Sequence, residues 1–173
     1  MESRAKLVGH GIHPMLIVFP LGLLSISVVW DIVYLSTGEG AWAFMAFWCI
    51  AAGVIGGLLA AIFGVWDWLA IPSGTRARAV GLWHGTGNVV VVVLFIVSWL
   101  LRLGNPSVTP VSGFVLSCIG LALALVTGWL GGELVERLGV GVGQGANLNA
   151  PSSLASAAPP AAVNAPPGLH QGS

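Results

Sequence analysis

Residues 41–70, AWAFMAFWCIAAGVIGGLLAAIFGVWDWLA, form an apolar run whose single charged residue, Asp67, lies near its end. A helix needs about 20 apolar residues to cross a hydrocarbon core about 30 Å thick, and this run is longer than that. It also lacks the apolar-polar alternation of membrane strands. Because a spanning segment must satisfy its own backbone hydrogen bonds, the run predicts a transmembrane helix.

Three further apolar stretches accompany this run, at about 14–35, 79–103 and 111–136. The chain of 173 residues is only 7% charged, and its mean hydropathy is +0.93. A soluble domain would need many more charged residues on its surface. The first stretch is too long for a signal peptide and no small-residue cleavage site follows it, so we expect it to be retained. The composition predicts an all-α integral membrane protein.

Short connections join the stretches, at 36–40, 71–78 and 104–110. Short loops make successive helices antiparallel neighbours, which predicts an up-down four-helix transmembrane bundle. We place this membrane domain at 1–143. Residues 144–173 are rich in Ala, Pro and Ser with almost no charge, and they predict a disordered C-terminal tail.

Basic residues are distributed unevenly between the two sides of such a bundle. If the N-terminus is inside, only Arg102 lies outside, and the other five lie inside: Arg4, Lys6, Arg76, Arg78 and Arg137. The positive-inside rule then predicts a multi-pass protein of the inner (plasma) membrane with both termini cytoplasmic. The lipid bilayer is the expected partner, and the net charge of zero gives no sign of nucleic-acid binding.

Polar residues gather near the cytoplasmic end of the four stretches. A charged residue at the bilayer centre costs roughly 2.5–3.5 kcal/mol on insertion scales, so such residues are candidates for function. Helix depths place one of them from each stretch in a single layer, and Asn88 lies one turn after His84 on the same face. The layer consists of His13, Asp67, His84, Asn88 and Glu133.

Two cofactors fit this layer. A haem b would use His13 and His84 as axial ligands across the bundle diagonal, with Asn88 as a hydrogen-bonding neighbour. A divalent metal ion would use His13 and His84 together with Asp67 and Glu133, a set that suits zinc, iron or manganese. Either centre would serve membrane electron transfer with a redox partner in the membrane.

Two interpretations need no cofactor. The same groups could form a proton or ion relay. They could instead form a polar clasp between helix ends in a non-catalytic structural or partner-binding module. In that clasp Glu133 would pair with Arg137, and Asp67 would pair with Arg76 or Arg78.

Two of the eight tryptophans, Trp66 and Trp83, adjoin members of the polar layer. Most tryptophans in such a chain belong to an aromatic belt at the membrane interface. Because Trp66 precedes Asp67 and Trp83 precedes His84, these two are also candidates for the wall of a cofactor pocket.

Several ordered motifs resemble the bacterial membrane family called domain of unknown function 2231. They are HPMLIVFPL at 13–21, DWLAIPSGTRAR at 67–78, HGTGN at 84–88 and GWLGGEL at 128–134 followed by GVGV at 139–142. The resemblance covers about 10–143 and implies a four-helix inner-membrane module without an assigned activity. Relatives fused to Rieske or c-type cytochrome domains would suggest redox work, but this chain has neither ligand motif. His10 is an extra histidine that could replace His13 as a ligand or be a surface residue.

Enzyme motifs are missing from the sequence. It contains no G-x-S-x-G, H-E-x-x-H or phosphate-binding loop, and its serines and threonines in apolar helices are of the kind that bond back to the backbone. We therefore expect neither a hydrolase nor a nucleotide-driven pump.

Overall fold

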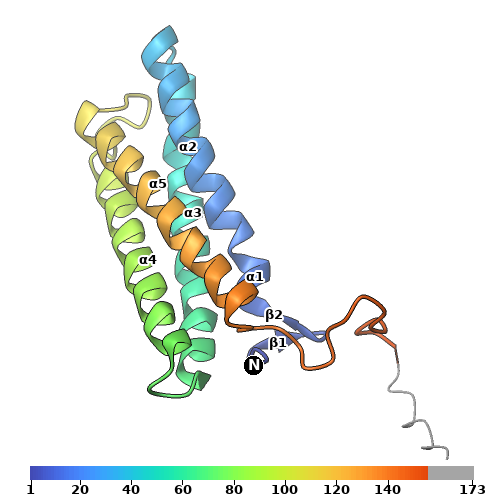
Figure 1. Cartoon of the computed structure of the whole chain (residues 1–173). Coiled ribbons are helices and arrows are strands. Elements are labelled where there is room, and N and C mark those ends of the chain that lie inside the picture. The colour runs from blue at the N-terminus through green and yellow to red at the C-terminus, as the bar shows by residue number, and fades with distance from the viewer. Residues whose placement is uncertain (156–173) are drawn as a thin grey trace, which may run out of the picture.

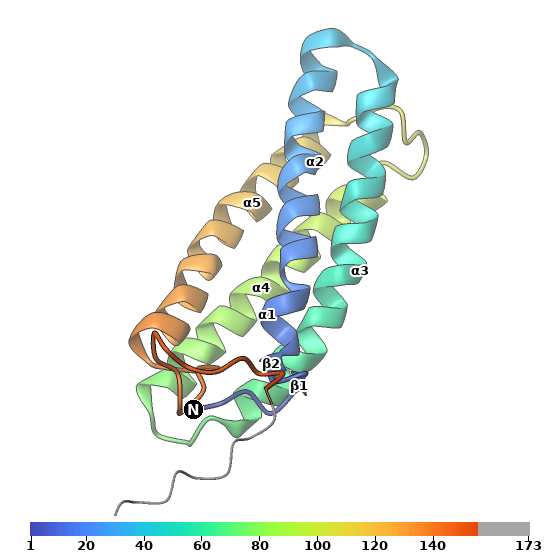
Figure 2. The same ribbon diagram turned by 90° about the vertical axis from the view of Figure 1, so that its right-hand side faces the viewer.

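The computed structural model describes residues 1–155, so the part of the predicted tail at 156–173 lies outside the described residues. Residues 144–155 contain turns without helix or strand. Four long helical spans lie side by side in an elongated bundle (Figures 1 and 2). The helices are α1 (Ile12–Leu16), α2 (Val18–Thr37), α3 (Gly40–Ala70), α4 (Arg76–Leu100) and α5 (Val111–Gly132), followed by the π-helical turn η1 (Glu133–Arg137).

Four helical stretches among the described residues are long and apolar enough to cross a membrane: Ile12–Thr37, Gly40–Ala70, Arg76–Leu100 and Val111–Arg137. This confirms the predicted all-α, four-helix transmembrane bundle. Helix α4, the third of the four predicted spans, begins three residues before its predicted start. The Thr75 hydroxyl accepts the Arg78 backbone N–H at 3.2 Å and caps this helix. Helix α2, which completes the first predicted span, ends where Gly38 adopts a left-handed conformation, with φ of 74°.

The bundle pairs its helices as two hairpins. Helices α2 and α3 pack along each other, as do α4 and α5, and the hairpins meet through α3 with α4 and α2 with α5. The span formed by α1 and α2 is therefore diagonally opposite α4. Between the hairpins lies an apolar core of Leu24, Val28, Ile50, Val91 and Phe95.

Glycines let the hairpin helices approach closely in this core. A Cβ atom on Gly53 would lie 2.7 Å from Leu24 Cδ2, and one on Gly120 would lie 2.9 Å from Phe95 Cε2. Small residues allow close backbone approach, which favours helix association in lipid. Most large apolar side chains instead point outward, to where the bilayer would contact them.

The two ends of the bundle differ. We call the end that carries residues 1–11, 71–75 and 133–143 the terminal end, and the opposite one the far end. At the terminal end an unpredicted β-hairpin precedes α1, with β1 (Lys6–Leu7) antiparallel to β2 (His10–Gly11). Its turn places Val8 and Gly9 at positive φ. The hairpin extends beside the bundle (Figure 1).

Candidate functional site

Two histidines from diagonally opposed spans meet near the terminal end. The ring centroids of His13 on α1 and His84 on α4 are 6.4 Å apart, and their ring planes are almost perpendicular, at 86°. Both side chains are partly buried. The histidines expected to share a layer are therefore side by side.

The His13 ring is held by the neighbouring helix α3. Its Nδ1 lies 2.9 Å from the backbone oxygen of Ala60. One turn further along, Gly64 leaves room for the ring, because a Cβ atom there would lie 2.9 Å from both Nδ1 and Cε1 of His13. A carbonyl oxygen can only accept, so Nδ1 of His13 donates, and in the neutral ring the lone pair is on Nε2.

The His84 ring is held in the same way by α5. Its Nδ1 lies 2.8 Å from the backbone oxygen of Thr127. One turn further along, Gly131 faces the ring, and a Cβ atom there would lie 3.1 Å from His84 Cε1. The Nδ1–H tautomer again leaves the lone pair on Nε2.

These matching contacts are part of an internal repeat of the two hairpins. Positions in the first span correspond to positions 71 residues later in the third, and positions in the second span to positions 67 residues later in the fourth. The close contact of Gly53 with Leu24 thereby corresponds to that of Gly120 with Phe95. The corresponding pairs are His13 and His84, Leu24 and Phe95, Ser27 and Ser98, Asp31 and Arg102, Gly53 and Gly120, Ala60 and Thr127, and Gly64 and Gly131.

The repeat relates the hairpins by an approximate two-fold rotation about the long axis of the bundle. Both the first and the third spans begin at the terminal end, and the contacts of α3 with α4 and of α2 with α5 correspond to each other. His13 and His84 therefore lie on opposite sides of this axis, as equivalent residues.

A short polar network makes the His84 side of the site different from the His13 side. The Asn88 amide nitrogen lies 2.8 Å from His84 O and 3.3 Å from His84 Nε2. The Thr127 hydroxyl donates to the Asn88 amide oxygen at 3.1 Å, which orients the amide. The corresponding residues in the first hairpin are the apolar Ile17 and Ala60.

Asp67 is separate from the histidine pair. Its Oδ2 accepts the Ser3 hydroxyl at 2.6 Å, and its Oδ1 accepts the backbone N–H groups of Arg4 at 2.7 Å and Ala5 at 3.2 Å. The expected pairing of Asp67 with a basic residue after α3 is therefore wrong. This carboxylate instead holds the N-terminal segment, residues 1–11, against the bundle.

The N-terminal segment also contacts the chain that follows η1. The Glu2 carboxylate is paired with Lys6 and accepts the backbone N–H of Gln144 at 3.1 Å. The hydrogen bond from Lys6, followed by that from Gln144, holds the pKa of Glu2 below its ordinary value. Since the site's histidine follows this segment directly, Asp67 and Glu2 help to place α1.

Glu133 forms an ion pair with Arg76 rather than with Arg137. Arg76 Nη2 lies 2.5 Å from Glu133 Oε1, which joins the start of α4 to η1. The expected pairing with Arg137 is wrong because η1 is a π-helical turn, whereas i,i+4 pairing assumes an α-helix. Arg78 donates to the backbone oxygens of Trp68 and Ile71 and caps the end of α3.

The four residues predicted as metal ligands are thus not gathered into one group. Among residues 1–155, no three or more His, Cys, Asp or Glu side chains lie close enough to hold a metal ion. The structure brings together His13 and His84, with Asn88 beside them, and it gives Asp67 and Glu133 other partners.

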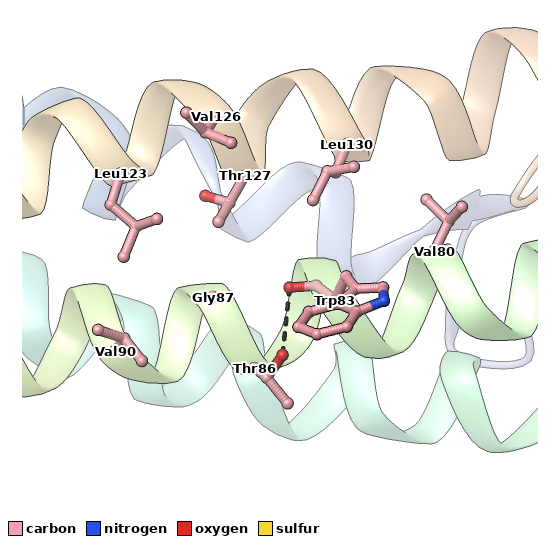
Figure 3. Close-up of a pocket in the computed structure, with 9 residues that line it drawn as sticks. All are labelled: Val80, Trp83, Thr86, Gly87, Val90, Leu123, Val126, Thr127 and Leu130. Carbon is pink, nitrogen blue, oxygen red and sulfur yellow. Dashed lines mark hydrogen bonds between the residues drawn. The ribbon is translucent and has the colours of Figure 1, made fainter.

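The two tryptophan candidates lie on the outer surface of the bundle. Trp66 is 56% exposed and Trp83 is 70% exposed. Trp83 lines an open groove of about 530 Å³ between α4 and α5 (Figure 3). Thr127, whose backbone oxygen accepts the hydrogen bond from His84 Nδ1, also lines this groove.

Sequence reasoning missed a second polar cluster, at the far end. Arg102 and Asp31 are both fully buried and form an ion pair, which Ser98, Thr109 and Ser117 complete with hydrogen bonds. The signal that could have revealed it is the spacing, since Asp31 and Arg102 are 71 residues apart, as the two histidines are.

Comparisons with known proteins found one relationship. The family model described as "Predicted membrane protein (DUF2231)" matches residues 9–144, which confirms the resemblance of the motifs. No curated protein and no solved structure matches the chain.

Proposed function

We propose that this chain, which belongs to the DUF2231 family of predicted membrane proteins, binds a redox metal centre between His13 and His84 and takes part in membrane electron transfer. The observation that carries the proposal is the shared geometry of the two rings. Each has Nδ1 on a backbone oxygen, so that in the neutral ring Nε2 carries the lone pair, which at His84 faces the Asn88 amide nitrogen at 3.3 Å. Metal-binding histidines almost always donate their other ring N–H to such an acceptor.

The separation of the rings supports a shared centre. Metal–nitrogen distances to histidine are about 2 Å, so two imidazoles that share one metal would have centroids up to roughly 6 Å apart. The centroids of His13 and His84 are 6.4 Å apart. The internal two-fold axis relates the two histidines, which suits a centre with two equivalent ligands.

The number of protein ligands favours haem b over a bare metal ion. Metal ions such as zinc usually take three or four protein ligands, and the described residues offer two here. A haem would bring its own nitrogen ligands to the iron, so that His13 and His84 would be sufficient to hold it. When bound, its iron would supply the one-electron chemistry.

The chain's own residues would orient and isolate the centre. Ala60 O and Thr127 O fix the ring tautomers, and Gly64 and Gly131 leave space for the rings. The Asn88 amide, which already bonds to His84 O at 2.8 Å, would keep that bond when His84 Nε2 takes up a ligand. The apolar core next to the site would limit access of water.

The site would lie on the cytoplasmic side of the inner membrane. Five of the six basic side chains, all except Arg102, belong to the terminal end of the bundle. Cytoplasmic loops carry such an excess, and both termini would then be cytoplasmic.

A second candidate function is the non-catalytic membrane module. The contacts that favour it are those of Asp67 with the N-terminal segment and of Glu133 with Arg76, because both join elements at the terminal end without any ligand. In this case the histidines only tie α1 to α3 and α4 to α5 through their Nδ1 hydrogen bonds.

Spectroscopy and elemental analysis distinguish the two candidates. The chain is produced with added haem precursor or with added iron, zinc or manganese, purified in detergent, and measured by visible absorption and by elemental analysis. A Soret band that shifts on reduction supports haem, and about one metal ion per chain without that band supports a bare ion. If neither appears under any of these conditions, the redox centre is excluded and the structural module stands.

A further inference from the structure

A sideways arm leaves the bundle at the terminal end. It consists of residues 1–11, which contain β1 and β2, and of residues 139–155, which contain neither helix nor strand. The two parts contact each other, since the Gly141 backbone N–H donates to Met1 O at 2.8 Å. In Figure 1 the arm extends away from the helices, and in Figure 2, seen from that side, it lies in front of them. The arm therefore occupies space beside the spans.

Three exposed tryptophans indicate where the bilayer surface lies relative to this arm. Each is within two residues of a site histidine or of the glycine that faces that histidine, so all three belong to the layer in which His13 and His84 meet. They are Trp66, Trp83 and Trp129. Tryptophans of membrane proteins gather at the membrane–water interface. The histidine layer is therefore close to the interface at the terminal end.

The arm is attached to the bundle at this same layer. Asp67, which follows Trp66, accepts hydrogen bonds from residues 3–5. Strand β2 ends two residues before His13. The loop at 71–75, in contrast, lies further out, because α4 begins seven residues before Trp83, roughly 10 Å at 1.5 Å per residue. The arm thus leaves the bundle at the level where lipid head groups would surround the spans.

The surface of the arm is apolar, although the arm lies outside the spans. Residues 139–155 contain no charged residue. Four large apolar side chains of the arm are exposed: Leu7, Val8, Leu148 and Leu154. Exposed apolar surface of this kind marks contacts with membranes or with other proteins.

Val8 occupies the turn of the β-hairpin at an unfavourable backbone angle. Its φ is 50°, in the left-handed region that a β-branched residue rarely adopts. Asn, Asp or Gly usually occupies such a turn position. The turn itself does not explain an exposed valine, which indicates that this apolar side chain contacts something outside the described chain.

We propose that the arm lies in the interfacial layer of the bilayer and binds phospholipid through its four exposed apolar side chains. Its level favours lipid over a soluble partner, because head groups and the adjoining acyl carbons surround the spans at the tryptophan layer. Arg4 and Lys6, both exposed, add positive charge where lipid phosphates lie. The contact needs no metal or haem, so it is independent of the proposed function.

Spin-label accessibility in the cofactor-free chain, held in phosphatidylcholine nanodiscs, tests the inference. Cys49 and Cys118 are first replaced by alanine, and one nitroxide is then attached at Leu148→Cys or Leu154→Cys. Ser73→Cys is the matched control, because this exposed position lies in the loop further from the membrane centre. Collision rates with oxygen, which concentrates in lipid, are divided by those with a water-soluble nickel chelate. We expect this ratio at both arm positions to be at least about threefold that at Ser73→Cys.

A second variant removes one apolar contact without straining the arm. Val8→Asn places in the turn a residue that accepts positive φ. The label at Leu154→Cys reports on it, because the neighbouring Ser153 lies against the turn, with its Cβ 2.9 Å from a Cβ placed on Gly9. We expect Val8→Asn to lower the ratio at this label by about half or more.

Three results would overturn the inference. A ratio at the arm positions equal to that at Ser73→Cys would show that the arm lies in water. Low collision rates with both reagents would show that protein, such as a second copy of the chain, covers it. A ratio that Val8→Asn leaves unchanged would show that the apolar side chain in the turn does not hold the arm at the membrane.

Discussion

Arg102 and Asp31 form a two-point ion pair in the far half of the bundle, with Nη1 2.6 Å from Oδ1 and Nη2 2.8 Å from Oδ2. Neither side chain has any exposed surface. The other Arg102 donors reach Ser98, Thr109 and Ser117, and the Thr109 hydroxyl donates to the Asp31 carboxylate at 2.8 Å. The pair therefore joins α2, the end of α4 and the start of α5 in an apolar environment.

Breaking this pair should strongly destabilise the protein. Asp31→Asn leaves a buried guanidinium without its counter-ion, a change that typically costs about 3–5 kcal/mol. We expect a clearly lower temperature of thermal unfolding in detergent. The double variant Asp31→Leu/Arg102→Met removes both charges and should recover much of the loss. Equal melting temperatures for the natural chain and Asp31→Asn would contradict this role.

The ion pair at the terminal end should matter far less. Arg76 is 62% exposed, so solvent screens its attraction to Glu133, and exposed pairs contribute about 0–1 kcal/mol. Glu133→Gln should therefore change the unfolding temperature only slightly under the conditions in which Asp31→Asn changes it greatly. A loss as large as that of Asp31→Asn would show that Glu133 has a further role.

The glycines beneath the histidines provide a steric test of the site. A methyl group on Gly64 or Gly131 would lie 2.9 or 3.1 Å from the facing imidazole and displace it, so Gly64→Ala and Gly131→Ala should reduce haem or metal uptake. Gly128→Ala is the matched control, because no atom lies within 4 Å of the position that its methyl group would take and alanine favours the helix by about 1 kcal/mol. Unchanged uptake in both site variants, measured by absorption and elemental analysis, would argue against ligation by these rings.

Asp67 should control the order of the N-terminal segment. Hydrogen bonds to a charged group contribute about 1.5–3 kcal/mol each, and Asp67→Ala removes three of them. Hydrogen exchange at the backbone amides of Arg4 and Ala5 should become at least tenfold faster. Exchange in the middle of α3 should remain slow, which serves as the internal control. Unaltered protection of the two amides would mean that other contacts hold the segment.

The sequence predicted the four helices because a span has a strong one-dimensional signature in its length and apolar composition. It also indicated that His13 and His84 belong to one layer, since both lie at similar depth in spans that start on the same side. The partners of Asp67 were not predictable in this way. They are mostly backbone N–H groups of residues 4 and 5, which carry no side-chain pattern.

The far-end ion pair was missed for a different reason. In the sequence Arg102 marks only the outer side of the predicted topology. Nothing but the 71-residue spacing, which equals that of the histidines, links it to Asp31. The repeat becomes clear only when packing contacts are compared, because few positions along the whole spans hold the same residue in both hairpins; Asp31 and Arg102 differ, as do Leu24 and Phe95.

Titration of haem into the cofactor-free chain measures whether His13 and His84 bind one centre together. His13→Ala and His84→Ala are compared with His10→Ala, which removes an exposed histidine whose Nδ1 lies 3.2 Å from Val8 O in its own β-hairpin. We expect the natural chain to saturate at one haem per chain with a Soret band. This band should be lost in both site variants and retained in His10→Ala. A band that persists in both site variants, or uptake that never saturates in the natural chain, would contradict this expectation.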